Sequence, residues 1–185
     1  ETQPVRAGPG AGLRVPIWLL GSSLFSAQLA GQLGLPYAFA SHFAPELLLE
    51  ALALYRRSFT PSDRLAQPLA MAAINVFAAD TDAEGVRLST SMQQSFARLS
   101  TGKPGKLPPP VDDITTVLTP QQIEGAKGRL LYSAIGGPET VRTQLADFIA
   151  LTQVDELMVT GMAFDNAARI RSLEIVAEVR EQLAA

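Results

Sequence analysis

Three serines lie within five residues, in the stretch LGSSLFS, where a predicted strand passes into a predicted helix. Ser22, Ser23 and Ser26 carry hydroxyl groups, and Gly21 before them allows a tight turn. A helix N-terminus presents unpaired amides and the positive end of its dipole, so this arrangement suits a phosphate group. A serine at this place is also a common helix N-cap. The residues alone leave both roles open, and the sequence contains neither G-x-G-x-x-G nor a P-loop motif.

The only histidine, His42, follows the second predicted strand. An imidazole there suits acid–base catalysis near neutral pH, and a structural place in the turn is the alternative. The chain has no cysteine, which excludes a thiolate nucleophile, and with a single histidine we expect no conventional zinc site. Asn75 is polar inside an apolar stretch and must find hydrogen-bond partners if it is buried. His42 is therefore our candidate catalytic residue, and we predict no metal.

Alternating apolar strands and amphipathic helices must position these side chains. Strands are predicted over 15–20, 37–40, 67–80 and 155–161. Helices are predicted over 24–33, from Pro45, from the Thr81–Glu84 capping box, over 120–131 and 136–151, and after Asp165. This order is typical of a parallel sheet covered by helices, whose strands gather ligands at their carboxyl ends.

The last predicted helix and the strand before it carry further expectations. In the helix, we expect Ile170, Leu173 and Ala177 to face inward and a charged stripe to face solvent. Asp155 and Glu156 lie at the N-terminal end of the fourth predicted strand, at the face of such a sheet that contributes to stability rather than to catalysis. We therefore assign these carboxylates to stability.

Composition limits the partners of the chain. Its 185 residues carry a formal net charge of -3 without a Lys or Arg run, so we predict neither nucleic-acid nor membrane-surface binding. The sequence shows no apolar run of about 18 residues and no signal-peptide pattern, and we predict a cytoplasmic protein. Residues 1–14 are predicted to be a linker, residues 15–185 one domain, and residues 101–120 a Pro-rich surface excursion.

Several stretches taken together resemble the C-terminal half of the bacterial luciferase-like monooxygenase family. They are LGSSLFSAQLAGQLGLPYAFASHFAP, ALALYRRSF, VFAADTDAEG, LPPP, DELMV and RIRSLEIVAE, in the family's order over residues 15 to 180. The resemblance implies strands five to eight of a (β/α)8 TIM barrel. It also implies an enzyme that uses reduced FMN, supplied by a separate flavin reductase, and O2 to oxidise a small organic substrate.

In such relatives, the loop after the fifth strand binds the flavin 5′-phosphate. The matching positions are Ser22, Ser23 and Ser26 with the amide of Leu24. The alpha chain of bacterial luciferase has an acidic residue in place of Ser22, which favours Ser23 and Ser26. The alternatives are a non-catalytic flavin- or phosphate-binding half-barrel and a barrel enzyme acting on a phosphorylated metabolite.

A complete barrel needs about 250 residues, and four predicted strands account for half of one. The front half would supply much of the flavin pocket and a basic partner for the phosphate. The open edges of a half-barrel would expose apolar surface and unpaired strands. We therefore expect either a truncated piece of a barrel or two half-barrels that pair, and we predict a homodimer or larger assembly.

Overall fold

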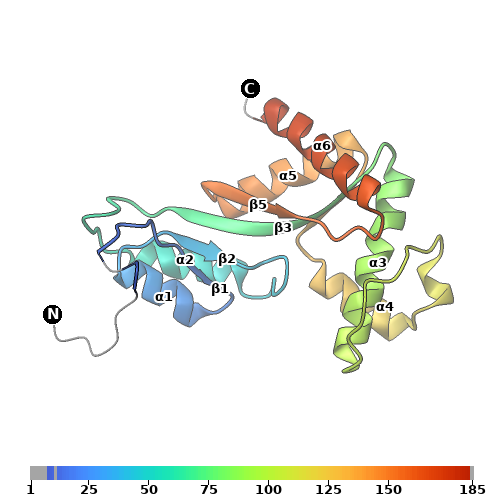
Figure 1. Ribbon diagram of the computed structural model, residues 1–185, viewed down its shortest axis with the longest axis horizontal. Helices are drawn as coiled ribbons and strands as arrows, with labels where there is room; N and C mark the ends of the chain where they lie inside the picture. The colour runs from blue at the N-terminus through green and yellow to red at the C-terminus, as the bar shows by residue number, and fades with distance from the viewer. Residues whose placement is uncertain (1–7, 11, 184–185) are drawn as a thin grey trace.

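A computed structural model describes residues 8–10 and 12–183 and contains five parallel strands and six α-helices (Figure 1). Strands and helices alternate along the chain except that α4 follows α3 without a strand between them. The strands are β1 (Leu19–Gly21), β2 (Tyr37–Phe39), β3 (Ala70–Ala78), β4 (Ser133–Gly136) and β5 (Glu156–Thr160). The helices are α1 (Leu24–Gln32), α2 (Leu48–Ser58), α3 (Asp82–Ser100), α4 (Pro120–Arg129), α5 (Pro138–Thr152) and α6 (Asn166–Leu183). A short 3-10 helix, η1 (Ile114–Thr116), interrupts the predicted excursion. The predicted α/β class with a parallel sheet is confirmed.

The long strand β3 organises the sheet. Ala72 in its first half pairs with Phe39 of β2 and also with Leu157 of β5. Asn75, in the second half, pairs with Ser133 of β4 and also with Thr160 of β5. Strands β2 and β4 therefore share one edge of β3, β5 occupies the other, and β1 extends the sheet beyond β2.

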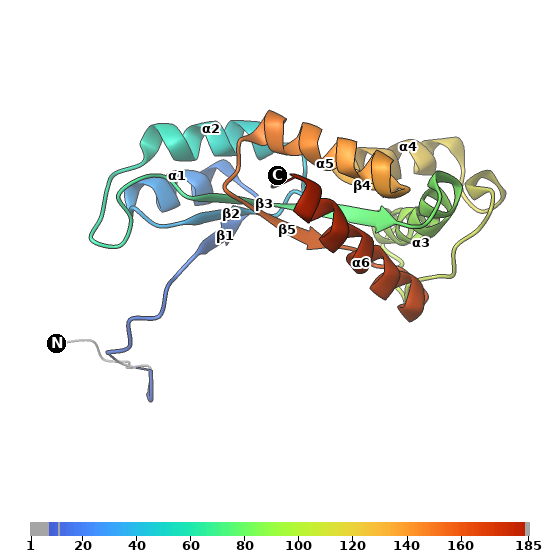
Figure 2. The same cartoon turned by 90° about the horizontal axis from the view of Figure 1, so that it is seen from above.

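The two faces of the sheet have different cores. Alternate residues of β3, such as Ile74 and Val76, join a buried cluster with residues of α1, α2, α5 and α6. Figure 2 shows α2 and α5 running along the sheet. On the opposite face, Phe77 packs with residues of α3 and α4. Elsewhere on that face apolar side chains are open, with Leu20 68% and Met158 52% exposed.

Two predictions about the elements were wrong. The strand β4 was missed, because its four residues, which end at Gly136, give too short an apolar pattern. In α6 the buried positions are Ser172, Ile175 and Val179, whereas Ile170 and Leu173 are each 49% exposed. On this inward face, Ser172 Oγ accepts a hydrogen bond from the Ala78 N–H of β3 at 3.0 Å.

Other expectations were confirmed at the level of single bonds. The Asp165 carboxylate accepts from the Ala168 N–H at 2.9 Å and so caps α6. The Asp155 carboxylate accepts from the Ala70 N–H at 2.8 Å, which ties the start of β3 to β5 and is a stabilising contact.

The predicted linker lies partly outside the described residues, and the strand predicted at 15–20 begins only at Leu19. No helix in the described part of the chain is both long and apolar enough to cross a membrane.

Candidate functional site

The predicted serine turn joins β1 to α1 at the carboxyl end of the sheet. Ser23 is the N-cap of α1, and its Oγ accepts from the Ser26 N–H at 3.3 Å. The Ser23 N–H donates to Ser26 Oγ at 3.4 Å, which completes a capping box. Gly21 is required here, because a Cβ at this position would lie 2.1 Å from Ser26 Oγ. The capping role is thus confirmed, and a cap does not exclude an anion at the same helix end.

The serines differ in what they can offer a ligand. Ser23 is exposed and Ser22 is half-buried, whereas Ser26 is only 8% exposed. The Ser26 hydroxyl donates to the Ser23 carbonyl at 2.7 Å and lies 3.2 Å from the Tyr37 hydroxyl. Burial raises the pKa of Tyr37, and its hydrogen bond with Ser26 opposes that rise. Ser26 therefore supports the turn from beneath, while Ser23 is exposed as a residue and donates its hydroxyl to Ser26 Oγ at 3.3 Å.

The amide groups at the start of α1 complete this part of the site. Leu24 is the first helical residue, so its N–H has no acceptor within the helix. The first turn of α1 contains no acidic residue, so the positive end of the helix dipole is not offset there by a side-chain charge. The turn combines serine hydroxyls, helix amides and a neutral cap, a donor set that suits a phosphate.

A second strand-to-helix turn, between β4 and α5, is built differently. Gly137 is the N-cap of α5, and its N–H donates to the Asp82 carboxylate at 2.6 Å. This bond, together with one from Thr140, holds the pKa of Asp82 below its ordinary value. Gly85 of α3 packs on the same strand end, because a Cβ there would lie 2.6 Å from the Gly136 nitrogen. A carboxylate of the chain itself thus occupies this helix N-terminus.

His42 lies beside the serine turn, at the end of the neighbouring strand. The Ala40 N–H donates to the Gly21 carbonyl at 2.9 Å, so β1 and β2 remain paired until they leave the sheet together. The imidazole is half-buried, and burial lowers its pKa. Its Nδ1 is buried without a hydrogen-bond partner among the described residues. A neutral imidazole at this edge can exchange a hydrogen bond or a proton with a ligand.

Asn75, Tyr37 and Arg129 extend the predicted set. Asn75 is 1% exposed, and its Nδ2 donates to the His42 carbonyl at 2.8 Å, which confirms that it finds a partner. Tyr37 and Arg129 were missed. Tyr37 begins an apolar strand, and its hydroxyl was the one sign in the sequence that it could contact the serine turn. Arg129 is one of the basic residues in the last turn of α4, and nothing in the sequence distinguishes it from other exposed cations at helix ends. The Arg129 guanidinium donates to the Phe43 carbonyl at 3.2 Å.

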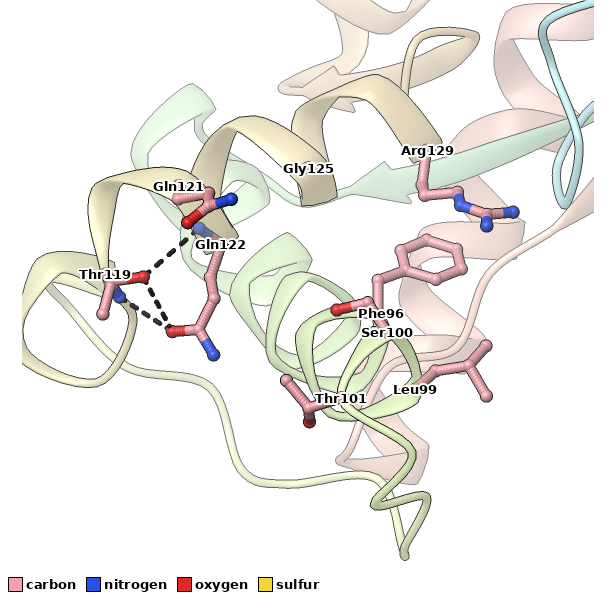
Figure 3. Close-up of a pocket in the computed structure, with 9 residues that line it drawn as sticks. All are labelled: Phe96, Leu99, Ser100, Thr101, Thr119, Gln121, Gln122, Gly125 and Arg129. Atoms are coloured by element: carbon pink, nitrogen blue, oxygen red, sulfur yellow. Dashed lines mark hydrogen bonds between the residues drawn. The ribbon is translucent and has the colours of Figure 1, made fainter.

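A groove between α3 and α4 adjoins this region (Figure 3). Its volume is about 730 Å³. At one end, Thr119 and Gln122 satisfy each other in the capping box of α4, as the dashed lines in Figure 3 show. At the other end lie Phe96 and Arg129. Arg129 links the groove to the His42 turn, because its guanidinium donates to the Phe43 carbonyl.

The chain is similar to known proteins over nearly its whole length. The family model "Luciferase-like monooxygenase" matches residues 1–156. A luciferase-like monooxygenase of Escherichia coli (strain K12) is 49% identical over 179 residues, which are 97% of this chain and 53% of that protein. The uncharacterized protein YvbT of Bacillus subtilis (strain 168) is 50% identical over 175 residues, 95% of this chain and 52% of that protein. The chain spans about half the length of the curated relatives it matches.

Solved structures agree with the fold. Apo-MsnO8 superposes with a TM-score of 0.78 at 31% identity, over 97% of this chain and 55% of that one. The oxygenating constituent of 3,6-diketocamphane monooxygenase from Pseudomonas putida, solved with FMN, gives a TM-score of 0.57 at 19% identity, over 88% of this chain and 47% of that one. Because the family model and the relative from Escherichia coli both match most of its length, the chain belongs to the luciferase-like monooxygenase family.

Proposed function

We propose that the chain is part of a flavin-dependent monooxygenase that uses reduced FMN and O2 to oxidise a small organic substrate. The observation that carries the proposal is the turn after β1: an exposed Ser23 caps α1, and no acidic residue occupies the first turn of the helix. In this family, that turn would hold the flavin 5′-phosphate. When bound, the flavin supplies the oxygen chemistry, and the protein supplies binding, orientation and exclusion of water.

The residues of the turn fit a phosphate in distinct roles. The Leu24 N–H and the Ser23 hydroxyl would donate to phosphate oxygens, and the half-buried Ser22 would add a further hydroxyl at the rim. Ser26 stays committed to the Ser23 carbonyl and to Tyr37, so it fixes the backbone that presents those donors. His42, at the end of the adjacent strand, would exchange a hydrogen bond or proton with the ring system or the substrate.

A pair of ligands that differ only in phosphate tests this proposal. We expect FMN to bind more tightly than riboflavin, measured by quenching of flavin fluorescence. Ser23→Gly removes the hydroxyl but keeps an acceptable N-cap, so it should weaken FMN binding roughly tenfold, as for a hydrogen bond to a charged group, and leave riboflavin unchanged. Thr119→Gly alters the matching cap of α4 and is the control. Equal losses for the two ligands would remove the phosphate assignment.

Turnover distinguishes the enzyme from the alternatives predicted from sequence. NADH consumption with FMN and an added flavin reductase tests for oxygenase turnover and for delivery of reduced FMN. Binding of FMN without turnover, in the chain and in a protein of its relatives' length, would favour a flavin-binding module. Preference for a sugar phosphate over FMN would favour an enzyme of phosphorylated metabolites.

The open face of the sheet supports a further part of the proposal. Leu20 and Met158 lie on edge strands whose outer sides are unpaired among the described residues. We propose that the free edges of β1 and β5 pair with four further strands to close a barrel. When this chain is present alone, a second copy of it would supply those strands. Light scattering should then give the mass of a dimer or larger assembly. A mass that corresponds to a stable, folded monomer would contradict a homodimer.

A further inference from the structure

Three consecutive residues after β2 are each fixed to another element. Ser41 is buried, and its hydroxyl donates to the Ala73 carbonyl of β3 at 2.5 Å. The His42 carbonyl accepts from Asn75 Nδ2 at 2.8 Å. The Phe43 carbonyl accepts from Arg129 Nη1 at 3.2 Å. One side-chain hydroxyl and two successive backbone carbonyls thereby tie this turn to β3 and α4.

The partners come from distant parts of the chain. Asn75 lies 33 positions and Arg129 lies 86 positions beyond the carbonyls they hold. Local bonds do contribute, since the Phe43 and Ala44 amides both donate to the Ala40 carbonyl at 3.1 and 3.0 Å. Those bonds close the turn, and the distant ones set where it sits against β3 and α4.

Placing a polar amide in the core has a cost that this bond offsets. Asn75 is 1% exposed on a strand otherwise composed of apolar residues. Burial of an amide without a hydrogen-bond partner is destabilising, whereas burial of an apolar residue at this site would carry no such penalty. The Asn75 side chain donates its hydrogen bond to the backbone carbonyl of His42, the one histidine in the protein.

We propose that Asn75 and Arg129 are positioning residues for His42. They fix the backbone of the 41–43 turn, so the imidazole is presented in one orientation beside the serine turn. Arg129 also makes this placement depend on α4, so the helix that follows the excursion sets the geometry of the strand-end site. The inference concerns the site of the proposed function, but the fixed turn exists without ligand.

The lone histidine allows a direct measurement on the ligand-free protein. A single imidazole carbon signal in the NMR spectrum reports His42 without assignment ambiguity. In the wild type we expect its pKa below 6.5, because burial disfavours the charged ring. Asn75→Leu is close in size and changes no charge. It should move the pKa toward 6.5, as the freed turn exposes the ring.

The choice of variants separates orientation from charge. Arg129 is the charged group that contacts the turn, and removing it would by itself raise the pKa of His42. Arg129→Gln is therefore assessed by amide exchange of Phe43 and Ala44, which should quicken roughly fivefold with the loss of one hydrogen bond. Because Arg129 is exposed, this variant is expected to fold even if Asn75→Leu does not.

Two matched controls complete the experiment. Ser133→Ala changes the residue paired with Asn75 across β3 and β4, and its Oγ is buried without a partner among the described residues. Lys127→Gln removes a cation from the same turn of α4. Both controls should leave the His42 signal and the exchange rates unchanged. Folded Asn75→Leu and Arg129→Gln proteins with wild-type exchange at Phe43 and Ala44 would overturn the proposal, whatever the outcome of flavin binding.

Discussion

The turn between β1 and α1 and the turn between β4 and α5 occupy equivalent places in the fold but differ in the charge that lies at the helix N-terminus. Both lead from the carboxyl end of a parallel strand into a helix N-terminus. At α1 the cap is a neutral, exposed serine, and the first turn has no acidic residue. At α5 the cap is Gly137, its amide donates to the Asp82 carboxylate, and Glu139 lies in the first turn.

The contrast shows how one fold element is used for two purposes. A helix N-terminus attracts negative charge wherever it lies. At α5 the chain supplies that charge itself and thereby joins α3 to α5. At α1 the chain supplies only neutral donors, so an external anion can take the same place. Fold alone does not distinguish the two turns, but the side chains around them do.

Converting the first turn into the second should have the largest effect. Ser23→Asp keeps a favourable N-cap and suits the helix dipole, so the unfolding free energy should hold or rise. The new carboxylate would repel a phosphate and replace a donor, so we expect FMN affinity to fall about hundredfold and riboflavin affinity to change little. Fluorescence titration measures both ligands. Undiminished FMN binding by this variant would remove the functional difference between the turns.

Crowding the second turn should cost the most stability. In Gly85→Ala the new Cβ would meet backbone atoms of Gly136 within 3 Å, and backbone cannot rotate away. We expect a loss of about 2–3 kcal/mol in urea unfolding, within the range for overpacked cores. Gly128→Ala is the matched control in α4, with nothing within 4 Å of the new atom, and should be neutral or slightly stabilising. Similar losses in both variants would contradict the close packing of α3 on β4.

Removing the support beneath the serines should have a smaller effect. Tyr37→Phe deletes the hydroxyl that lies 3.2 Å from Ser26 Oγ and is expected to cost about 1 kcal/mol in urea unfolding. Ser26 keeps its bond to the Ser23 carbonyl, so FMN affinity should change less than in Ser23→Gly. Tyr132→Phe, in a ring pair with Phe148, is the control. A loss of FMN binding larger than that of Ser23→Gly would instead place Ser26 or Tyr37 in direct contact with the phosphate.

The smallest expected effect depends on pH. Asp82 has a lowered pKa in the folded chain, so its stabilisation is present above its ordinary value of 3.8 and disappears as the pH falls through the folded value. Asp82→Asn should therefore be less stable than the wild type at pH 7. The difference should shrink below about pH 3.8, as measured by urea unfolding. A difference that is constant from pH 7 to pH 3 would show that the charge of Asp82 does not hold α5.

The sequence predicted the elements better than the contacts between them. The strand predicted over 67–80, a serine cap on the first helix and the Asp165 cap follow from local patterns, and the structure has them. Of the predicted Thr81–Glu84 capping box, the structure has the bond from the Glu84 N–H to Thr81, while the Glu84 carboxylate pairs with Arg87. The inward face of α6 was predicted wrongly, because its apolar residues lie on two sides and only the sheet decides which is covered.

The candidate site divides in the same way. The serines and His42 are visible as polar groups at predicted strand ends. Sequence spacing could not show that Ser26 faces Tyr37 or that Arg129 reaches Phe43, because these contacts span 11 and 86 positions. Such long-range contacts depend on strand order, which local periodicity does not determine.

The place of β5 in the sheet has a consequence for synthesis. The Asp155 carboxylate holds the Ala70 amide across 85 positions, and β5 pairs along the centre of β3. A ribosome makes these residues several seconds apart, at about 5–20 residues per second. During that interval one edge of β3 has no partner, and the nascent chain exposes the strand that later organises the sheet. Chaperones that bind extended apolar segments would find their target there until Thr160 emerges.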